Sequence, residues 1–279
     1  QEKLPQVAGE FVWTGFDYLG EPTPYFARRQ LNDEDWPARS SYFGAVDLAG
    51  FPKDRYYLYK SVGTAEPMVH VLPHWNWAGR EGSRIPVFCY TNADAVELFL
   101  NGRSLGVKKR WSEPVELPVG PNVSKDRKYM SKYRLMWQVP YQPGSLRAVA
   151  LKDGKTVAAQ EVRTAGAPAR IVLQPDRSRI HADGDDLAFV TVRIEDKDGN
   201  ICPLADNLVK FAVAGPGRIA AVDNGNSATT EPFQASQRKA FNGLALLIVR
   251  SEAGRTGRVR ITATSDGLRP AAGTVVTAK

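Results

Sequence analysis

Four residues near the start of the chain have side chains that could act on a sugar: Glu10, Trp13, Asp17 and Glu21. Residues 11–13 predict a short buried strand, and the residues after them predict a polar loop. In barrel enzymes the loops at the C-terminal ends of the strands form the catalytic face, where a flat indole can stack on a sugar ring. Trp13 is therefore a candidate sugar-binding residue. Asp17 is a second candidate, which either contacts a sugar hydroxyl or makes a structural hydrogen bond in the loop.

The two glutamates do not form a catalytic pair. Hydrolysis of a glycosidic bond with retention needs two carboxyl groups roughly 5 Å apart, one as nucleophile and one as acid/base. Glu10 precedes the predicted strand, so it belongs to the opposite end or the interior of such a barrel. Glu21 is expected to pair with a base such as Arg28 or Arg29. The chain therefore has no predicted catalytic residue.

The string FVWTGFDYLGEPTPY, residues 11–25, resembles the last barrel strand in family 2 glycoside hydrolases of the β-galactosidase type. Residues 40–44 (SSYFG) and 47–54 (DLAGFPKD) resemble the segment that closes that barrel. The resemblance implies that Trp13 forms a wall of the pocket for the galactose ring. It also implies that both catalytic glutamates lie upstream of any residue present here, so we expect this chain alone to be inactive.

The rest of the chain has short alternating strands separated by turn signals. This pattern predicts a mainly β fold with two immunoglobulin-like sandwiches, at residues 63–165 and 168–279, joined by the linker 165–168. Asn101-Gly102 and Asp153-Gly154 are the turn signals of the first sandwich. Predicted strands include 85–91, 95–100, 132–141, 145–151, 157–162, 169–173, 187–195, 209–213, 240–250 and 258–264.

Both predicted sandwiches resemble the immunoglobulin-like domains appended to a subgroup of bacterial family 2 enzymes, the last of them invasin-like. The strings HWNWAGREG, TNADAVELFLNGRSLG, VDNGN, EPFQASQRKAFNG and TATSDGL carry this likeness. Residues 1–62 are then interpreted as the C-terminal remnant of the (β/α)8 barrel, with its last helix at 56–61. The resemblance implies a retaining mechanism through a covalent glycosyl-enzyme, a carbohydrate substrate as partner, and no cofactor. The N-terminal barrel domains are the implied structural partner.

Trp75 and Trp77 form a second aromatic cluster, in which the two indoles project to the same side if the chain is extended. They either form a ledge for stacking on sugar or pack one domain against another, and packing is the preferred interpretation. Two other functions remain open. The chain could be an adhesion or spacer protein of tandem sandwiches, or a carbohydrate-binding module with Trp75, Trp77 and Trp111 as platforms.

Composition excludes several classes of function. The net charge of +7 is concentrated around a predicted loop near residues 118–122, and no nucleic-acid reading motif accompanies it. The longest apolar runs have the length of strands, so no membrane insertion is expected. Cys89 and Cys202 are predicted to be buried free thiols, and the spacing of His70 and His74 does not suit a metal site. By analogy with bacterial polysaccharide-degrading enzymes, a periplasmic or secreted location is expected.

Overall fold

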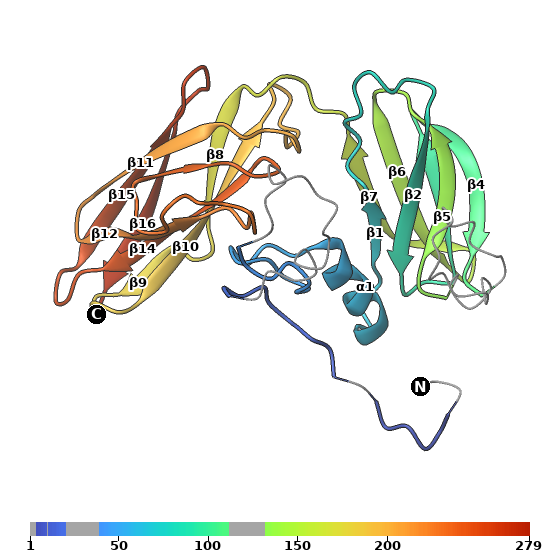
Figure 1. Cartoon of the computed structure of the whole chain (residues 1–279), viewed down its shortest axis with the longest axis horizontal. Coiled ribbons are helices and arrows are strands. Elements are labelled where there is room, and N and C mark those ends of the chain that lie inside the picture. The colour runs from blue at the N-terminus through green and yellow to red at the C-terminus, as the bar shows by residue number, and fades with distance from the viewer. Residues whose placement is uncertain (1–3, 10, 21–38, 112–131) are drawn as a thin grey trace. The chain divides into compact units, whose positions relative to one another are not determined.

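The computed structural model describes residues 4–9, 11–20, 39–111 and 132–279. These residues form one helix, α1 (Asp54–Gly63), and the sixteen strands β1 to β16, which pair mostly antiparallel in several sheets (Figure 1). The predicted mainly β fold is confirmed. The chain divides into two compact units. The middle unit contains Asp54–Arg170 and Ile194–Ala205, and the terminal unit contains Gln1–Lys53, Ile171–Arg193 and Asp206–Lys279.

Two sheets form the middle unit. One has the strand order β1 (Val69–Leu72), β2 (Arg84–Thr91) and β5 (Leu135–Pro140). The other has the order β4 (Arg103–Lys109), β3 (Ala95–Leu100), β6 (Ser145–Lys152) and β7 (Lys155–Arg163). Buried side chains from both sheets belong to one hydrophobic cluster, which includes Val87, Leu98, Val139 and Leu146. The two sheets therefore pack face to face around a common core.

The hairpin turns of this unit follow from local sequence. Asn101 and Gly102 have φ values of 50° and 81°, and Asp153 and Gly154 have φ values of 49° and 74°. Two successive residues with positive φ match the right-handed twist of the flanking strands, and asparagine, aspartate and glycine adopt this conformation at low cost. Both predicted turns are confirmed, joining β3 to β4 and β6 to β7.

Trp75 is a core residue of the middle unit. Its side chain is 0% exposed and meets the Tyr141 ring edge-on at 5.2 Å. Its indole N–H donates to the Gln142 carbonyl at 2.9 Å, so burial leaves no unpaired donor. Trp75 was a candidate sugar-binding residue, and the structure corrects this: a fully buried indole presents no face to a sugar. The gain from burying so large an apolar ring explains the outcome.

The linker predicted at residues 165–168 is held by hydrogen bonds. The Asn76 amide donates to the Ala165 carbonyl at 2.9 Å and accepts from the Ala165 N–H at 3.0 Å. The next N–H, that of Gly166, donates to the Asp196 carboxylate at 2.9 Å. Since both polar groups of Ala165 are paired and the residue is only 7% exposed, this part of the linker is built into the structure.

The C-terminal strands form two further sheets. One has the order β12 (Gly217–Asp223), β14 (Leu244–Ser251), β10 (Leu187–Glu195) and β8 (Arg170–Pro175). The other has the order β13 (Gln237–Lys239), β11 (Leu208–Ala214), β15 (Gly257–Thr264), β16 (Ala271–Ala278) and β9 (Arg179–His181), with β9 parallel to β16. The predicted alternation along residues 187–195 is confirmed, because Ala188, Val190 and Val192 are fully buried whereas Phe189 is 39% exposed.

The strand expected at residues 11–13 is absent. Phe11 is fully exposed, Trp13 is 71% exposed, and these residues have no assigned strand. A strand requires a hydrogen-bonded neighbour, and none of the described residues pairs with this run. Pairing begins further along, at the isolated bridges of Phe16 with Val46 and of Leu19 with Ser40. A barrel remnant is therefore not evident in the described residues.

The helix expected at residues 56–61 is present as α1, which belongs to the middle unit and packs on β1 and β2. Asp54 bonds His70 of β1 at 2.9 Å, and the Tyr57 ring stacks on the His70 ring at 3.8 Å. In the described part of the chain, no helix has the length and apolar character needed to cross a membrane.

Both cysteines are free and buried, as predicted. Burial raises the pKa of each thiol above its ordinary value, most strongly at Cys89, which lies in the core of the middle unit. A neutral buried thiol is a poor nucleophile. Cys89 and Cys202 are therefore packing residues.

We expect Trp75→Ala to lower the free energy of unfolding by about 3–5 kcal/mol, because it leaves a cavity and an unpaired Gln142 carbonyl. The half-buried neighbour Trp77 provides the matched control, and Trp77→Ala should cost clearly less. Urea unfolding followed by circular dichroism measures both. Equal losses for the two variants would show that Trp75 is not a principal core residue.

Candidate functional site

Asp17 is the residue on which the first segment is assembled. Its residue exposure is 6%. One carboxylate oxygen accepts the Gly44 N–H at 2.7 Å, and the other bonds the Lys53 ammonium at 2.6 Å. The Lys53 ammonium also donates to the Tyr42 carbonyl at 2.8 Å. Both oxygens are engaged by the protein itself, so of the two roles considered for Asp17 the structure favours the structural one.

Gly44 permits this arrangement. A Cβ at this position would lie 2.4 Å from the Asp17 nitrogen and 2.5 Å from the Phe16 carbonyl carbon. No side chain can occupy that space without moving the backbone. Gly44 is therefore a residue of the site that the sequence reasoning missed, because a close approach between distant segments leaves no local sequence signal.

Backbone hydrogen bonds connect the loop after Trp13 to residues 45–46. The Ala45 N–H donates to the Thr14 carbonyl at 3.1 Å, and the Val46 N–H donates to the Gly15 carbonyl at 2.9 Å. In return the Asp17 N–H donates to the Val46 carbonyl at 2.9 Å. The residue that follows Trp13 is thus fixed directly to the turn region that begins at Ala45.

Trp13 projects from this assembly with most of its surface free. Its indole N–H donates to the Tyr18 hydroxyl at 3.1 Å, and the two rings meet edge-on at 6.2 Å. Tyr18 in turn meets the Phe43 ring edge-on at 5.9 Å. The Trp13–Thr14 peptide bond is cis. One polar contact and one ring contact orient the indole, while 71% exposure leaves apolar area available for stacking on a sugar.

The remaining tryptophan candidates are placed differently. Trp77 is half-buried, stacks on His74 at 4.7 Å and donates its indole N–H to the His74 carbonyl at 2.9 Å. Because Trp75 is buried, the two do not form a shared ledge. Trp111 is 45% exposed, and the Lys132 ammonium lies 4.8 Å from its ring centre.

Glu10, Glu21, Arg28 and Arg29 lie outside the described residues. Within the described ranges, no three His, Cys, Asp or Glu side chains gather in a way that could hold a metal ion. His70, considered above with His74, makes its contacts with Asp54 and Tyr57. The described residues thus provide a candidate binding surface at Trp13 and no candidate metal centre.

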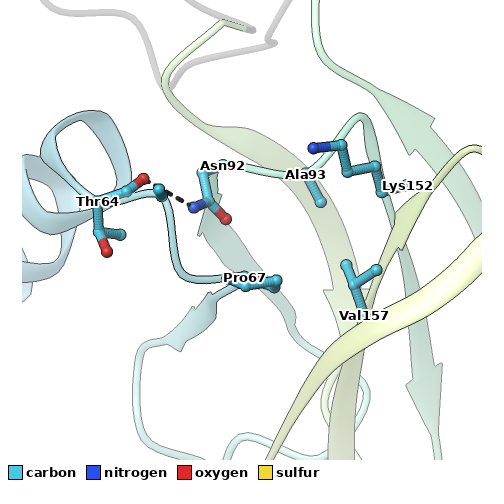
Figure 2. A pocket seen from close by; sticks show the side chains of 7 residues that line it. Thr64, Pro67, Asn92, Ala93, Lys152 and Val157 are labelled. Carbon is cyan, nitrogen blue, oxygen red and sulfur yellow. Dashed lines mark hydrogen bonds between the residues drawn. The ribbon is translucent and has the colours of Figure 1, made fainter.

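A cavity of about 260 Å³ lies in the middle unit. It is lined on one side by residues that follow α1, among them Thr64 and Pro67, and on the other by Lys152 and Val157 (Figure 2). The Asn92 amide beside it donates to the Thr64 carbonyl at 3.0 Å and to the Glu66 carbonyl at 2.7 Å. The Asn92 side chain thus connects the segment after α1 to the β2–β3 turn. Its amide N–H groups are used in these bonds, so it is not free to orient a ligand.

We expect Asp17→Ala to release the loop after Trp13, because it leaves the Lys53 ammonium and the Gly44 N–H without their carboxylate. Loss of charge-assisted hydrogen bonds of this kind costs about 2 kcal/mol. Hydrogen exchange at the amides of Val46 and Lys53 should accelerate by about thirtyfold, the equivalent of that free energy. Asp198→Ala is the control, since Asp198 pairs with Lys197 at an exposed site and such pairs contribute little. Unchanged exchange in Asp17→Ala would contradict this role.

Two family profiles match the chain. "Glycoside hydrolase family 2 C-terminal domain 5" matches residues 171–274, and "Domain of unknown function (DUF4982)" matches residues 82–158. A β-galactosidase from Bacteroides ovatus is 50% identical over 95% of this chain, which spans 28% of that protein's length. A putative β-glucuronidase from Formosa agariphila is 36% identical over 83% of the chain and 21% of its own length.

Solved structures agree with these matches. A family 2 glycosyl hydrolase from Bacteroides cellulosilyticus superposes with a TM-score of 0.83 at 32% identity, covering 100% of this chain and 37% of its own. A β-glycosidase from Bacteroides vulgatus gives a TM-score of 0.81 at 36% identity, over 96% of this chain and 31% of its own. The chain thus spans well under half the length of the relatives it matches. It belongs to glycoside hydrolase family 2, of which it carries C-terminal domains.

Proposed function

We propose that this chain is part of a retaining glycoside hydrolase of the β-galactosidase type, which hydrolyses terminal β-linked sugars. The observation that carries the proposal is the 50% identity with a β-galactosidase over 95% of the chain. Because the chain spans 28% of that relative, the activity is attributed to the complete protein and not to this chain. A periplasmic or secreted location, with a carbohydrate as substrate and the barrel domains as partners, is part of the same proposal.

Trp13 is the residue through which this chain contributes to sugar binding. An exposed indole offers a flat apolar face to the C–H bonds of a sugar ring. The structure supports this role by its exposure and by the contacts with Tyr18 that orient the ring. Asp17 has an indirect role: it fixes the loop that carries Trp13, and both of its carboxylate oxygens are already bonded to the protein.

We propose the domain division into 1–62, 63–165 and 168–279, with the last two as immunoglobulin-like sandwiches. The paired sheets and shared core of the middle unit support a sandwich at 63–165. The family 2 match at 171–274 supports the last domain. The full burial of Trp75 counts against a carbohydrate-binding module with Trp75, Trp77 and Trp111 as platforms. A spacer protein would not account for a similarity that extends across the whole chain.

This chain alone should have no glycosidase activity, because the catalytic glutamate pair is expected elsewhere in the complete enzyme. The purified chain is to be incubated with chromogenic β-galactosides and β-glucuronides, the latter because a putative β-glucuronidase is among the relatives. Turnover of about one per second or more, typical of an enzyme, would overturn this expectation.

In the complete enzyme, Trp13→Ala should lower kcat/KM for the preferred glycoside by roughly tenfold to over a hundredfold. The reason is that loss of an aromatic wall costs on the order of 1–3 kcal/mol of transition-state binding. Trp111→Ala, which removes another exposed indole, is the matched control and should leave kcat/KM unchanged. Melting temperature and circular dichroism check that both variants fold. Unchanged kinetics, or global unfolding, in Trp13→Ala would each remove Trp13 from the binding site.

A further inference from the structure

Asp47 lies at the start of a tight turn in the first segment and fixes that turn with its own side chain. Its carboxylate accepts the Phe51 N–H at 2.9 Å, while its carbonyl accepts the Gly50 N–H at 3.0 Å. The other carboxylate oxygen faces Gly225 of the C-terminal strands. A Cβ on Gly225 would lie 2.0 Å from that oxygen. The two segments therefore touch at a point where only a glycine fits.

The turn that contains Gly225 is rigidly built. One Asp223 oxygen accepts the Asn224 N–H at 2.7 Å and the guanidinium of Arg238, which is 0% exposed, at 3.0 Å. The Asn224 amide donates to the Lys239 carbonyl at 2.9 Å. These bonds tie the turn to β13, so it presents a fixed surface to Asp47.

A second contact joins the same two segments. The Ser227 carbonyl accepts the N–H groups of Arg39, at 2.6 Å, and of Ser40, at 3.3 Å. Ser40 also forms a bridge with Leu19, in the loop that follows Trp13. Residues 39–53 thus contact the turn Asp223–Ser227 at two places: Arg39 and Ser40 through Ser227, and Asp47 through Gly225.

The path from this contact to Trp13 is short. Val46, the residue before Asp47, bonds Gly15 and Asp17 through its backbone, and Ala45 bonds Thr14. Thr14 follows Trp13 directly. Asp47 is therefore linked to the residue next to the exposed indole through Val46, Ala45 and the single hydrogen bond from the Ala45 N–H to the Thr14 carbonyl.

We propose that the turn Asp223–Ser227 is the support that holds the Trp13 loop in position, and that protonation of Asp47 tightens this support. In the terms of the proposed function, the C-terminal domain would position a residue of the sugar pocket and make that positioning sensitive to pH. The role in sugar binding rests on the proposed function, whereas the support itself does not.

The electrostatics give the direction of the pH effect. The pKa of Asp47 is raised from its ordinary 3.8 to about 6, chiefly by burial and to a smaller extent by the nearby Asp223 carboxylate. Lys53 and the backbone N–H groups of Phe51 and Ala49 oppose this rise. Because the docked state holds the proton more tightly than the free state, docking is strongest below about pH 4 and weakens as the pH rises through 6.

The support can be tested by hydrogen exchange on the chain itself. Gly225→Ala forces the Asp47 carboxylate away, and exchange at the amides of Asp17 and Val46 should accelerate by about tenfold. Gly254→Ala is the matched control: Gly254 has φ +70° against +73° for Gly225, but a Cβ there meets nothing within 4 Å. The backbone strain is thus the same in both variants, and only one of them loses the contact. Equal exchange at Asp17 and Val46 in the two variants would overturn the support.

The role of Asp47 has its own test, which also applies if Gly225→Ala fails to fold. With exchange corrected for its intrinsic pH dependence, protection at Asp17 and Val46 should fall roughly tenfold between pH 5 and pH 7, as the raised pKa requires. Asp47→Asn keeps an acceptor for the Phe51 N–H but cannot ionise, so its protection should not vary over this range. A fall that persists in Asp47→Asn would overturn the assignment to Asp47.

The kinetic consequence is measured separately in the complete enzyme. Gly225→Ala should lower kcat/KM for the preferred glycoside at least threefold relative to Gly254→Ala. If Gly225→Ala accelerates hydrogen exchange but leaves kcat/KM unchanged, the turn does not position a sugar-binding residue. If Trp13→Ala leaves kcat/KM of the complete enzyme unchanged, the proposed role of Trp13 in sugar binding is wrong. The hydrogen-exchange result on Gly225→Ala still decides whether the turn supports the Trp13 loop.

Discussion

The first segment depends on a buried carboxylate. Asp17 is only 6% exposed, so its carboxylate depends on partners within the protein, because an unpaired buried charge is costly. It finds them in the Gly44 N–H and the Lys53 ammonium. These contacts join residues 14–20 to residues 40–53, two runs that have neither regular strands nor a large core of their own. The exposed Trp13 is held near a defined position because this one carboxylate is satisfied.

Two glycines allow the first segment to make close contacts that no larger residue would permit. The backbone of Asp17 lies too close to Gly44 for a side chain there, and the carboxylate of Asp47 lies too close to Gly225. Both contacts join residues distant in sequence. They place Trp13, Asp17, Asp47 and the turn Asp223–Ser227 in one connected set. In the proposed function, the C-terminal domain thereby takes part in shaping the substrate pocket.

The middle unit illustrates why fold and function have to be argued separately. By sequence, Trp75 and Trp77 could serve binding or packing, and packing is the preferred interpretation. Trp75 is fully buried and its indole N–H is hydrogen-bonded. The adjacent Asn76 side chain hydrogen-bonds the linker backbone at Ala165. The cluster that seemed a candidate sugar ledge is thus part of the packing of this unit. Sandwich folds carry many unrelated functions, and only specific exposed groups assign one.

The sequence by itself determined the parts of the fold that local patterns control. Alternation along β3 and β10 placed their buried faces correctly, because the period of two is a local property. Asn101-Gly102 and Asp153-Gly154 marked the β3–β4 and β6–β7 turns, because positive φ is local as well. The strands β1, β4, β9, β12, β13 and β16 were not predicted, since they are short, are rich in glycine or lysine, or lack a clear alternation.

Only the tertiary structure decided the rest. Residues 11–13 have the composition of a strand but no partner among the described residues, and composition cannot supply one. Trp75 and Trp77 are the same residue type two positions apart, and the local sequence does not distinguish them. Trp75 is buried and Trp77 is half-buried, because burial depends on which parts of the folded chain cover each ring. The roles of Asp17, Gly44 and Gly225 arise from contacts across 27 residues or more in the sequence. Such contacts are properties of the folded chain, and nothing in the neighbouring residues records them.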